Sequence, residues 1–128
     1  YTHTQAEASR DDAQSGVLDG DELASVPGNT MSLRMGAQVG ARWDSYAVVK
    51  YTDSMCVNVS CNRDESRFAE TEGFVVIDLG SRYAFTEALS AFVKLENALD
   101  ERAIVSRQPD GARPNKPRTA MIGVEWMF

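Results

Sequence analysis

The sequence predicts an all-β protein, in the form of an antiparallel, up-and-down transmembrane β-barrel segment of about six strands. Three observations support this fold class: strict alternation of apolar and polar residues, strands of unusual length, and long connections that alternate with short ones. Residues 30–43 show the clearest alternation. Because successive side chains of a strand point to opposite faces, this pattern predicts a strand with one apolar face. A length of about a dozen residues is typical of a tilted transmembrane strand.

The other strands follow from the same period of two. In order, the predicted strands are residues 1–9, 30–43, 45–55, 73–85, 88–96 and 118–128. The first is short and weakly patterned. In the last, one face consists of Ala120, Ile122, Val124, Trp126 and Phe128. This apolar face could cover the core of a soluble sandwich or face lipid in an outer-membrane barrel.

The connections favour the barrel. Long polar stretches occupy residues 10–29, 56–71 and 97–117, whereas Asp44-Ser45 and Thr86-Glu87 predict tight reversals. Outer-membrane barrels have long loops outside and short turns on the periplasmic side. Large aromatic residues also gather at the strand ends beside the short turns: Trp43, Tyr83, Phe85, Trp126 and Phe128. We therefore expect an aromatic girdle at the periplasmic interface.

Composition narrows the functional classes. A chain of 128 residues has room for one domain, and its formal net charge of −6 argues against nucleic acid as a partner. No apolar run is long enough for a membrane-spanning helix. Residues 1–5 carry no signal-peptide features, so we expect either a cytosolic chain or the downstream part of a longer one. No catalytic constellation, metal cluster or phosphate-binding glycine loop is present in the sequence, so we do not expect an enzyme.

The two cysteines, Cys56 and Cys61, are separated by four residues in a polar stretch. A short-loop disulfide is the preferred interpretation, and it would indicate an oxidising compartment. Two free thiols are the alternative. A metal site would need more ligands, and the single histidine, His3, is distant in the sequence.

The C-terminal half resembles the TonB-dependent outer-membrane receptors. The resemblance rests on residues 74–83, residues 93–102 with the corner Asn97-Ala-Leu-Asp100, residues 105–118, and the terminal aromatic Phe128. The stretch Ser106-Arg-Gln-Pro-Asp-Gly-Ala-Arg-Pro114 is most similar to the ferric dicitrate receptor branch. The match covers roughly residues 26–128. The corner lacks the aromatic residue typical of the family.

The resemblance implies a place and a function. Residues 1–128 would be the C-terminal part of the β-barrel of a larger receptor, without its plug domain. That receptor would import a ferric chelate, of siderophore or ferric citrate type, across the bacterial outer membrane, with no covalently bound cofactor. Its partners would be outer-membrane lipid and lipopolysaccharide, the plug and remaining strands, the TonB system through the N-terminal part, and the barrel-assembly machinery. Phe128 would be the mark that this machinery reads.

Charged residues supply the candidate binding sites. The last long connection contains a cluster of cations: Arg102, Arg107, Arg113, Lys116 and Arg118. Ferric citrate and many siderophore complexes are anionic, and guanidinium groups hold carboxylates in a bidentate fork, so Arg107 and Arg113 are candidate ligand contacts. Solvated loop charge, or contact with lipopolysaccharide phosphates, is the alternative. Charges on the inward faces are expected to pair with one another or with a plug: Arg34, Asp78, Arg82, Lys94 and Glu96.

Two other architectures stay open. One is a soluble all-β binding module of an oxidising compartment, and the other is a small independent or oligomeric barrel. The arrangement of the apolar face separates the soluble module from a membrane wall. A wall predicts a bare apolar band formed by Leu33, Val39, Ile77, Leu95 and Val124, whereas a soluble module would pack them in a closed core.

Overall fold

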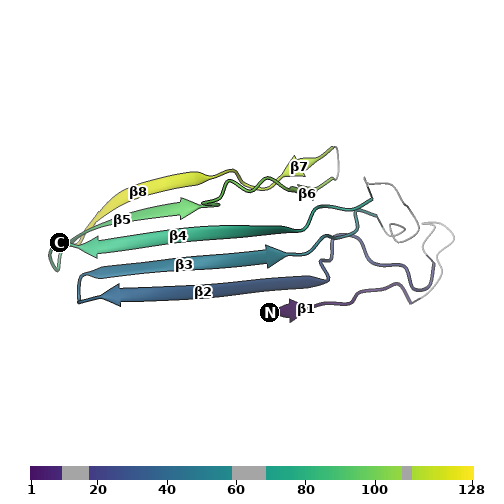
Figure 1. Ribbon diagram of the computed structural model, residues 1–128, viewed down its shortest axis with the longest axis horizontal. Coiled ribbons are helices and arrows are strands. Elements are labelled where there is room, and N and C mark those ends of the chain that lie inside the picture. Colours follow the sequence, from purple (N-terminus) through teal and green to yellow (C-terminus); the bar gives the residue numbers. More distant parts are fainter. Residues whose placement is uncertain (10–17, 59–68, 108–110) are drawn as a thin grey trace. The chain divides into compact units, whose positions relative to one another are not determined.

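The computed structural model describes residues 1–9, 18–58, 69–107 and 111–128. Its strands are β1 (Thr2–His3), β2 (Asn29–Val39), β3 (Trp43–Thr52), β4 (Phe74–Ala84), β5 (Leu89–Glu96), β6 (Ile104–Ser106), β7 (Arg113–Pro114) and β8 (Thr119–Trp126) (Figure 1). In these ranges, no helix is both long and apolar enough to span a membrane.

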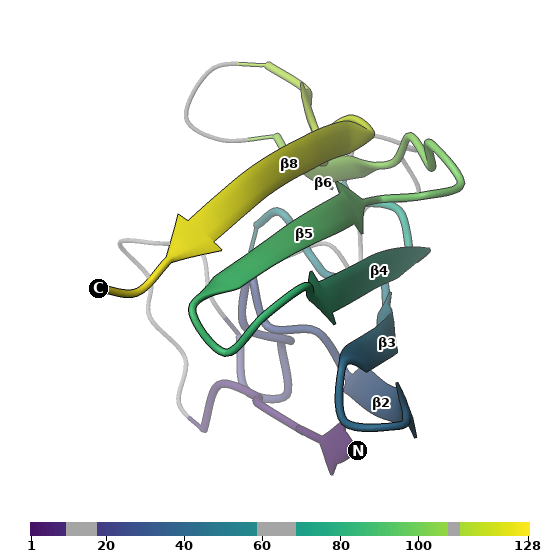
Figure 2. The ribbon, with the colours of Figure 1, turned by 90° about the vertical axis from the view of Figure 1, so that its left-hand side faces the viewer.

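The strands are arranged in the up-and-down order that the sequence predicts. Six of them form one sheet in the order β1-β2-β3-β4-β5-β8, and β6 pairs with β7 in a second, two-stranded sheet. The register of β5 against β8 runs antiparallel from Leu89 opposite Trp126 to Glu96 opposite Thr119. Figure 2 shows β8, β5 and β4 as successive neighbours. The predicted antiparallel all-β fold is therefore confirmed.

The chain divides into two compact units, which are described separately. Unit 1 consists of Tyr1–Met31, Tyr51–Phe74 and Arg102–Asn115. Unit 2 consists of Ser32–Lys50, Val75–Glu101 and Lys116–Phe128. Unit 1 therefore holds the ends of the long connections and the β6–β7 hairpin, and unit 2 holds most of the long strands and both tight turns.

The first tight reversal does not lie at Asp44-Ser45 as predicted. The chain turns at residues 40–42, and Trp43 is the first residue of β3. Gly40 has a φ of +63°, a left-handed conformation that glycine adopts without the steric cost of a Cβ. The apolar alternation continues through Ala41 by coincidence, so periodicity did not reveal where the strand ended.

Two other predicted segments also differ from the structure. Only Thr2–His3 of the predicted strand 1–9 forms a strand, and beyond it the ladder is reduced to an isolated bridge between Glu7 and Glu22. The predicted loop 97–117 contains the short strands β6 and β7. The N-terminal segment pairs with residues distant in the sequence, and β6 and β7 are very short. In such segments a period of two is too brief to predict a strand.

The second tight turn is where the sequence predicts it. Thr86 Oγ1 accepts hydrogen bonds from the backbone N–H of Ala88 at 3.2 Å and of Leu89 at 3.0 Å. The Phe85 N–H donates to the Leu89 carbonyl at 2.9 Å. A threonine hydroxyl at this position offers the turn a local partner, which explains why the reversal needs no glycine.

The apolar face of unit 2 is bare. Leu33, Val39 and Val124 are 46%, 63% and 68% exposed, and neither Ile77 nor Leu95 is buried. Among the described residues, the buried hydrophobic side chains are those of Cys56, Ala69 and Ala103. The predicted apolar band is therefore confirmed, and the closed core that a soluble module needs is not formed by these strands.

The opposite face of unit 2 contains two aromatic rings, each lying over a glycine. A Cβ built on Gly80 would lie 2.3 Å from the Tyr46 ring, and one built on Gly123 would lie 2.4 Å from the Phe92 ring. Gly123 is the direct cross-strand partner of Phe92. Glycine at these two positions leaves space that the rings of neighbouring strands fill.

Candidate functional site

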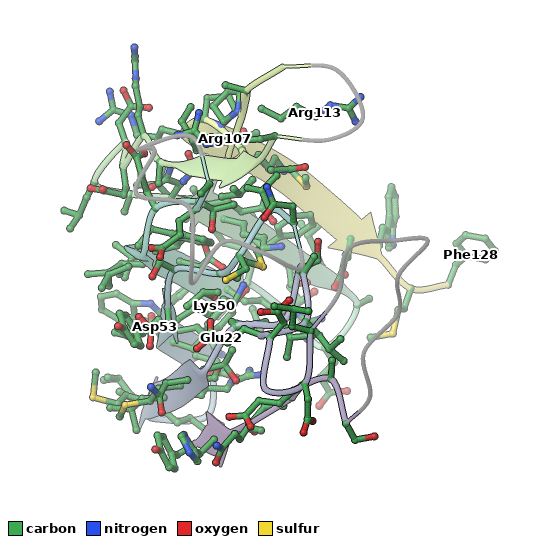
Figure 3. All side chains as sticks on the ribbon, turned by 90° about the vertical axis from the view of Figure 1, so that its right-hand side faces the viewer. Glu22, Lys50, Asp53, Arg107, Arg113 and Phe128 are labelled. Carbon is green, nitrogen blue, oxygen red and sulfur yellow. The ribbon has the colours of Figure 1, made fainter. Side chains whose placement is uncertain are left out.

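The two predicted ligand contacts, Arg107 and Arg113, lie at the β6–β7 hairpin of unit 1, and both are labelled in Figure 3. Ser106, the residue before Arg107, is opposite Arg113 across the hairpin. The Arg107 Nε donates a hydrogen bond to the backbone carbonyl of Glu70 at 2.8 Å. Arg113 is exposed.

This arrangement gives the two arginines different capacities. One donor of the Arg107 guanidinium is engaged with the Glu70 carbonyl, and this bond fixes the hairpin against the segment that follows residue 68. Arg113 makes no ion pair among the residues that the structure describes, so its planar fork of N–H donors faces solvent. Of the two, Arg113 is the better placed to hold a carboxylate in bidentate fashion.

Two of the other predicted loop cations, Lys116 and Arg118, belong to unit 2. Lys116 belongs to unit 2 and pairs with Glu96, while Arg118 donates its backbone N–H to Asp100 Oδ1 at 3.2 Å. Lys116 is therefore bound to the end of β5.

Cys56 lies in the small core of unit 1. It is 5% exposed and clusters with Ala69, and its backbone bridges to Glu70. Cys56 is disulfide-bonded. Cys61, the only other cysteine of the chain, lies outside the described residues, so the Cys56–Cys61 pairing stays a prediction.

Unit 1 also has a concavity of about 410 Å³ that sequence reasoning missed. Its polar lining includes Glu7, Glu22, Asp53, Glu70 and His3. Four carboxylates around one opening repel anions, so this surface does not suit a negatively charged chelate. Among the described residues, no group of three or more His, Cys, Asp or Glu side chains could hold a metal ion. The acidic residues come from separate segments, and only folding brings them together.

The Asp53 carboxylate belongs to a hydrogen-bonded cluster at one side of this concavity. Asn29 Nδ2 donates to Asp53 Oδ2 at 2.9 Å, and the Tyr51 hydroxyl donates to Oδ1 at 3.1 Å. Asn29 Oδ1 lies 2.9 Å from His3 Nδ1 and accepts from the Tyr1 hydroxyl at 3.0 Å. The bond from Asn29, followed by that from Tyr51, lowers the pKa of Asp53 below its ordinary value of 3.8.

We expect this cluster to weaken only under strongly acidic conditions. A carboxyl whose folded-state pKa is lowered stabilises the fold fully above its unfolded pKa, and the effect is lost as the pH falls through the lowered value. Below a pH of about 3.8, the Asn29 side-chain amide should progressively lose protection from hydrogen exchange. In Asp53→Asn this protection should no longer change with pH over that range. Protection in the parent chain that is equally insensitive to acid would contradict the role of Asp53.

The polar face of unit 2 has paired charges. Asp78 accepts from Lys50 Nζ at 2.7 Å, Arg82 bonds Glu125 at 2.8 Å, and Lys94 bonds Glu96 at 2.7 Å. The expected pairing of inward charges is therefore confirmed for Asp78, Arg82, Lys94 and Glu96. Lys50 and Glu125 are the partners that sequence reasoning missed, because pairing across strands depends on the register.

The corner after β5 is built around Asn97, which is 2% exposed. Its Nδ2 donates to the carbonyls of Glu101 and Lys116, both at 2.9 Å, and its Oδ1 accepts the Glu101 N–H at 2.9 Å. The Asn97 N–H donates to Asp78 at 3.0 Å. Asn97 thus links β4, the end of β5 and the approach to β8.

Phe128 lies two residues beyond the end of β8 and is fully exposed (Figure 3). Its ring points away from the ribbon in this view. It makes no ring contact with another aromatic residue of the described chain, in contrast to Tyr83 and Phe85, whose rings meet edge-on at 5.2 Å. Its predicted role in assembly stays a prediction.

Solved structures with the same fold are receptors. The siderophore receptor PiuA from Acinetobacter baumannii has a TM-score of 0.73 and 18% identity, covering 84% of this chain and 15% of that one. The closed form of the ferric-catecholate import receptor Fiu from K12 E. coli has a TM-score of 0.72 and 24% identity. The match covers 93% of this chain and 16% of that one. BauA, the ferric preacinetobactin receptor from Acinetobacter baumannii, has a TM-score of 0.71 and 19% identity. The match covers 94% of this chain and 18% of that one.

These likenesses show the fold of the chain, an antiparallel sheet like a section of the β-barrels in those proteins. The chain spans 15–18% of the length of these three receptors. No protein-family model and no curated protein sequence matches it.

Proposed function

We propose that residues 1–128 form the C-terminal section of the wall of a TonB-dependent receptor in the bacterial outer membrane, and that the whole receptor imports a ferric chelate. In this proposal the long strands β2, β3, β4, β5 and β8 cross the membrane, and the long connections between strands lie on the extracellular side. The work of the chain is binding and gated passage rather than catalysis.

The observation that carries the proposal is the contrast between the two faces of unit 2. One face is apolar and bare, whereas the other carries ion pairs between neighbouring strands. Lipid is the environment in which such a face is stable, because water would leave a large apolar surface exposed. The receptors with this fold are named for siderophores and ferric chelates, which supports the same class of cargo.

Membrane fractionation tests the location. The chain should be recovered with the outer membrane and require detergent for extraction. Folded barrels usually migrate differently on gels with and without boiling, and the receptor that contains this chain should do so. Recovery as a monodisperse monomer in detergent-free buffer would contradict the proposal and favour the soluble binding module.

Arg113 is the proposed contact for a carboxylate-bearing chelate. Replacing it with glutamine removes the charge and the bidentate fork, so ferric citrate should bind about tenfold more weakly to iron-starved cells that produce the receptor. Arg42→Gln, at the short-turn end of unit 2, is the matched control and should leave binding unchanged. Equal loss in both variants would indicate a general charge effect.

Removing Phe128 is expected to impair assembly while leaving the fold of the β5–β8 pair intact. The residue lies beyond the last paired position of β8, so its loss breaks no ladder hydrogen bond. Surface labelling of intact cells should show less receptor in the outer membrane, whereas Phe128→Trp, which keeps a terminal aromatic, should restore it. Unchanged surface levels after the deletion would remove Phe128 from this role.

A further inference from the structure

Two serines, Ser45 of β3 and Ser81 of β4, interrupt the apolar face of unit 2. Ser81 lies opposite Val93 of β5, and Val93 lies opposite Ile122 of β8. Because residues directly opposite in an antiparallel pair point to the same face, the Ser81 side chain shares a face with the exposed Ile122. The Ser45 Oγ lies 2.9 Å from the Ser81 Oγ, so it belongs to this face too. A pair of hydroxyl groups thus lies within the bare apolar surface.

The indole of Trp43 holds this serine pair. Its Nε1 donates a hydrogen bond to the Ser81 Oγ at 2.7 Å. Trp43 is the first residue of β3, directly after the short turn at residues 40–42. Because a strand rises about 3.3 Å per residue, Ser45 lies about 7 Å farther along β3, away from the turn. Tryptophan is enriched where a membrane meets water, so a wall strand would hold the serine pair just on the hydrocarbon side of that boundary.

The hydrogen bonds of the pair leave one donor unused. The Trp43 N–H and the two hydroxyl groups supply three hydrogens, and the two bonds of the cluster use two of them. Whichever serine donates to the other, the hydroxyl hydrogen of the accepting serine has no partner among the residues that the structure describes. A donor beside hydrocarbon is costly unless an acceptor reaches it, so an acceptor from outside the chain is favoured here.

We infer that the Ser45–Ser81 pair, held by Trp43, binds an ester carbonyl of a diacyl phospholipid. A carbonyl oxygen accepts hydrogen bonds and donates none, which matches the single unused hydroxyl hydrogen. In such a lipid the ester carbonyls are the acceptors nearest to the acyl chains, whereas the phosphate lies farther toward water. The exposed Val93 and Ile122 beside the pair offer an apolar surface to the adjoining acyl chain. This inference rests on the proposed membrane location.

A comparison of an ester lipid with an ether lipid tests the inference. The full chain in detergent micelles is titrated with dihexadecanoyl phosphatidylethanolamine or with its dihexadecyl ether analogue, which keeps the head group and chain length but lacks both carbonyls. The readout is the indole Nε1–H resonance of Trp43 by NMR, since this hydrogen bonds the Ser81 oxygen. We expect about fivefold tighter binding of the ester lipid, the effect of one ordinary hydrogen bond. Equal affinities for the two lipids would overturn the inference.

Variants separate the two hydroxyl groups from general lipid contact. Ser45→Ala should keep the preference for the ester lipid, because Ser81 retains a hydrogen to donate. Combining it with Ser81→Ala should lower the ester-to-ether affinity ratio to about one, since no hydroxyl remains. Ser32→Ala is the matched control, because it removes an exposed hydroxyl from the opposite face of β2, and it should bind as the parent chain does. An unchanged ratio in the double variant would overturn the inference.

The lipid comparison also separates this inference from the membrane proposal on which it rests. A chain that stays monodisperse in detergent-free buffer would contradict the membrane location and the lipid site together. A chain that requires detergent but binds both lipids equally would overturn the lipid site alone, because water would then serve the unused hydroxyl hydrogen as well as an ester does.

Discussion

Replacing Ile122 with arginine is expected to destabilise the membrane-inserted state by about 2–4 kcal/mol, the typical cost of a cation near the bilayer midplane on the lipid face of a barrel. Ile122 lies in the middle of β8 on the bare apolar face, opposite Val93, and is 79% exposed. Because this exposed side chain has few protein contacts to lose, the change in unfolding free energy shows whether lipid or water surrounds the residue. Urea-induced unfolding in lipid vesicles provides the measurement.

The adjacent residue supplies the matched control. Met121 precedes Ile122 in β8 and points to the opposite, polar face, where it is opposite Lys94. Met121→Arg should cost far less than Ile122→Arg if only one face meets lipid. Equal costs at the two positions would contradict the assignment of faces, and no cost at either would contradict the membrane wall itself.

Asn97→Ala is expected to lower the free energy of unfolding by about 3–5 kcal/mol, since each buried hydrogen-bonding group left without a partner costs about 1–3 kcal/mol. The substitution removes three side-chain hydrogen bonds that join the corner to Glu101 and to Lys116. Asn97 also has a φ of +50°, which alanine adopts less readily. Chemical denaturation in detergent, with hydrogen exchange at Glu101, measures the loss.

Two further substitutions separate these causes. Asn97→Gly accepts the left-handed backbone but lacks the side chain, so it should recover only the smaller, conformational part of the loss. Leu99→Ala changes an exposed residue of the same corner and should alter stability by less than about 0.5 kcal/mol. If Asn97→Gly restores full stability, the backbone conformation rather than the hydrogen bonds is what the residue provides.

Periodicity predicted the long strands because each has one face that differs consistently from the other. In β8 the alternation from Thr119 to Trp126 marks both the strand and its apolar face. Periodicity failed at Gly40, where the reversal falls within a run that still alternates, so the end of β2 was placed too late. A turn that glycine permits leaves the pattern of its neighbours unchanged, and only backbone geometry reveals it.

The sequence predicts that ion pairs form between the strands, but it does not show which residues pair. Charges of both signs on the inward face of neighbouring strands predict ion pairs, yet the partners Lys50 for Asp78 and Glu125 for Arg82 depend on the register. Similarly, a sequence shows that residue 80 is glycine but not that the Tyr46 ring lies above it. Register sets which side chains meet, and it results from hydrogen bonding along whole strands.

The sequence by itself determined the long strands, the apolar face and the alternation of long connections with tight turns, because these depend on local periodicity and turn chemistry. Tertiary structure alone decided the acidic concavity of unit 1, the hydrogen bonds of Asn97 and the stacking of Arg34 on Tyr46 above Gly80. Each of these brings together residues from separate strands or loops. Their chemistry exists only after pairing has fixed the register, whereas a strand's own pattern is present in the unfolded chain.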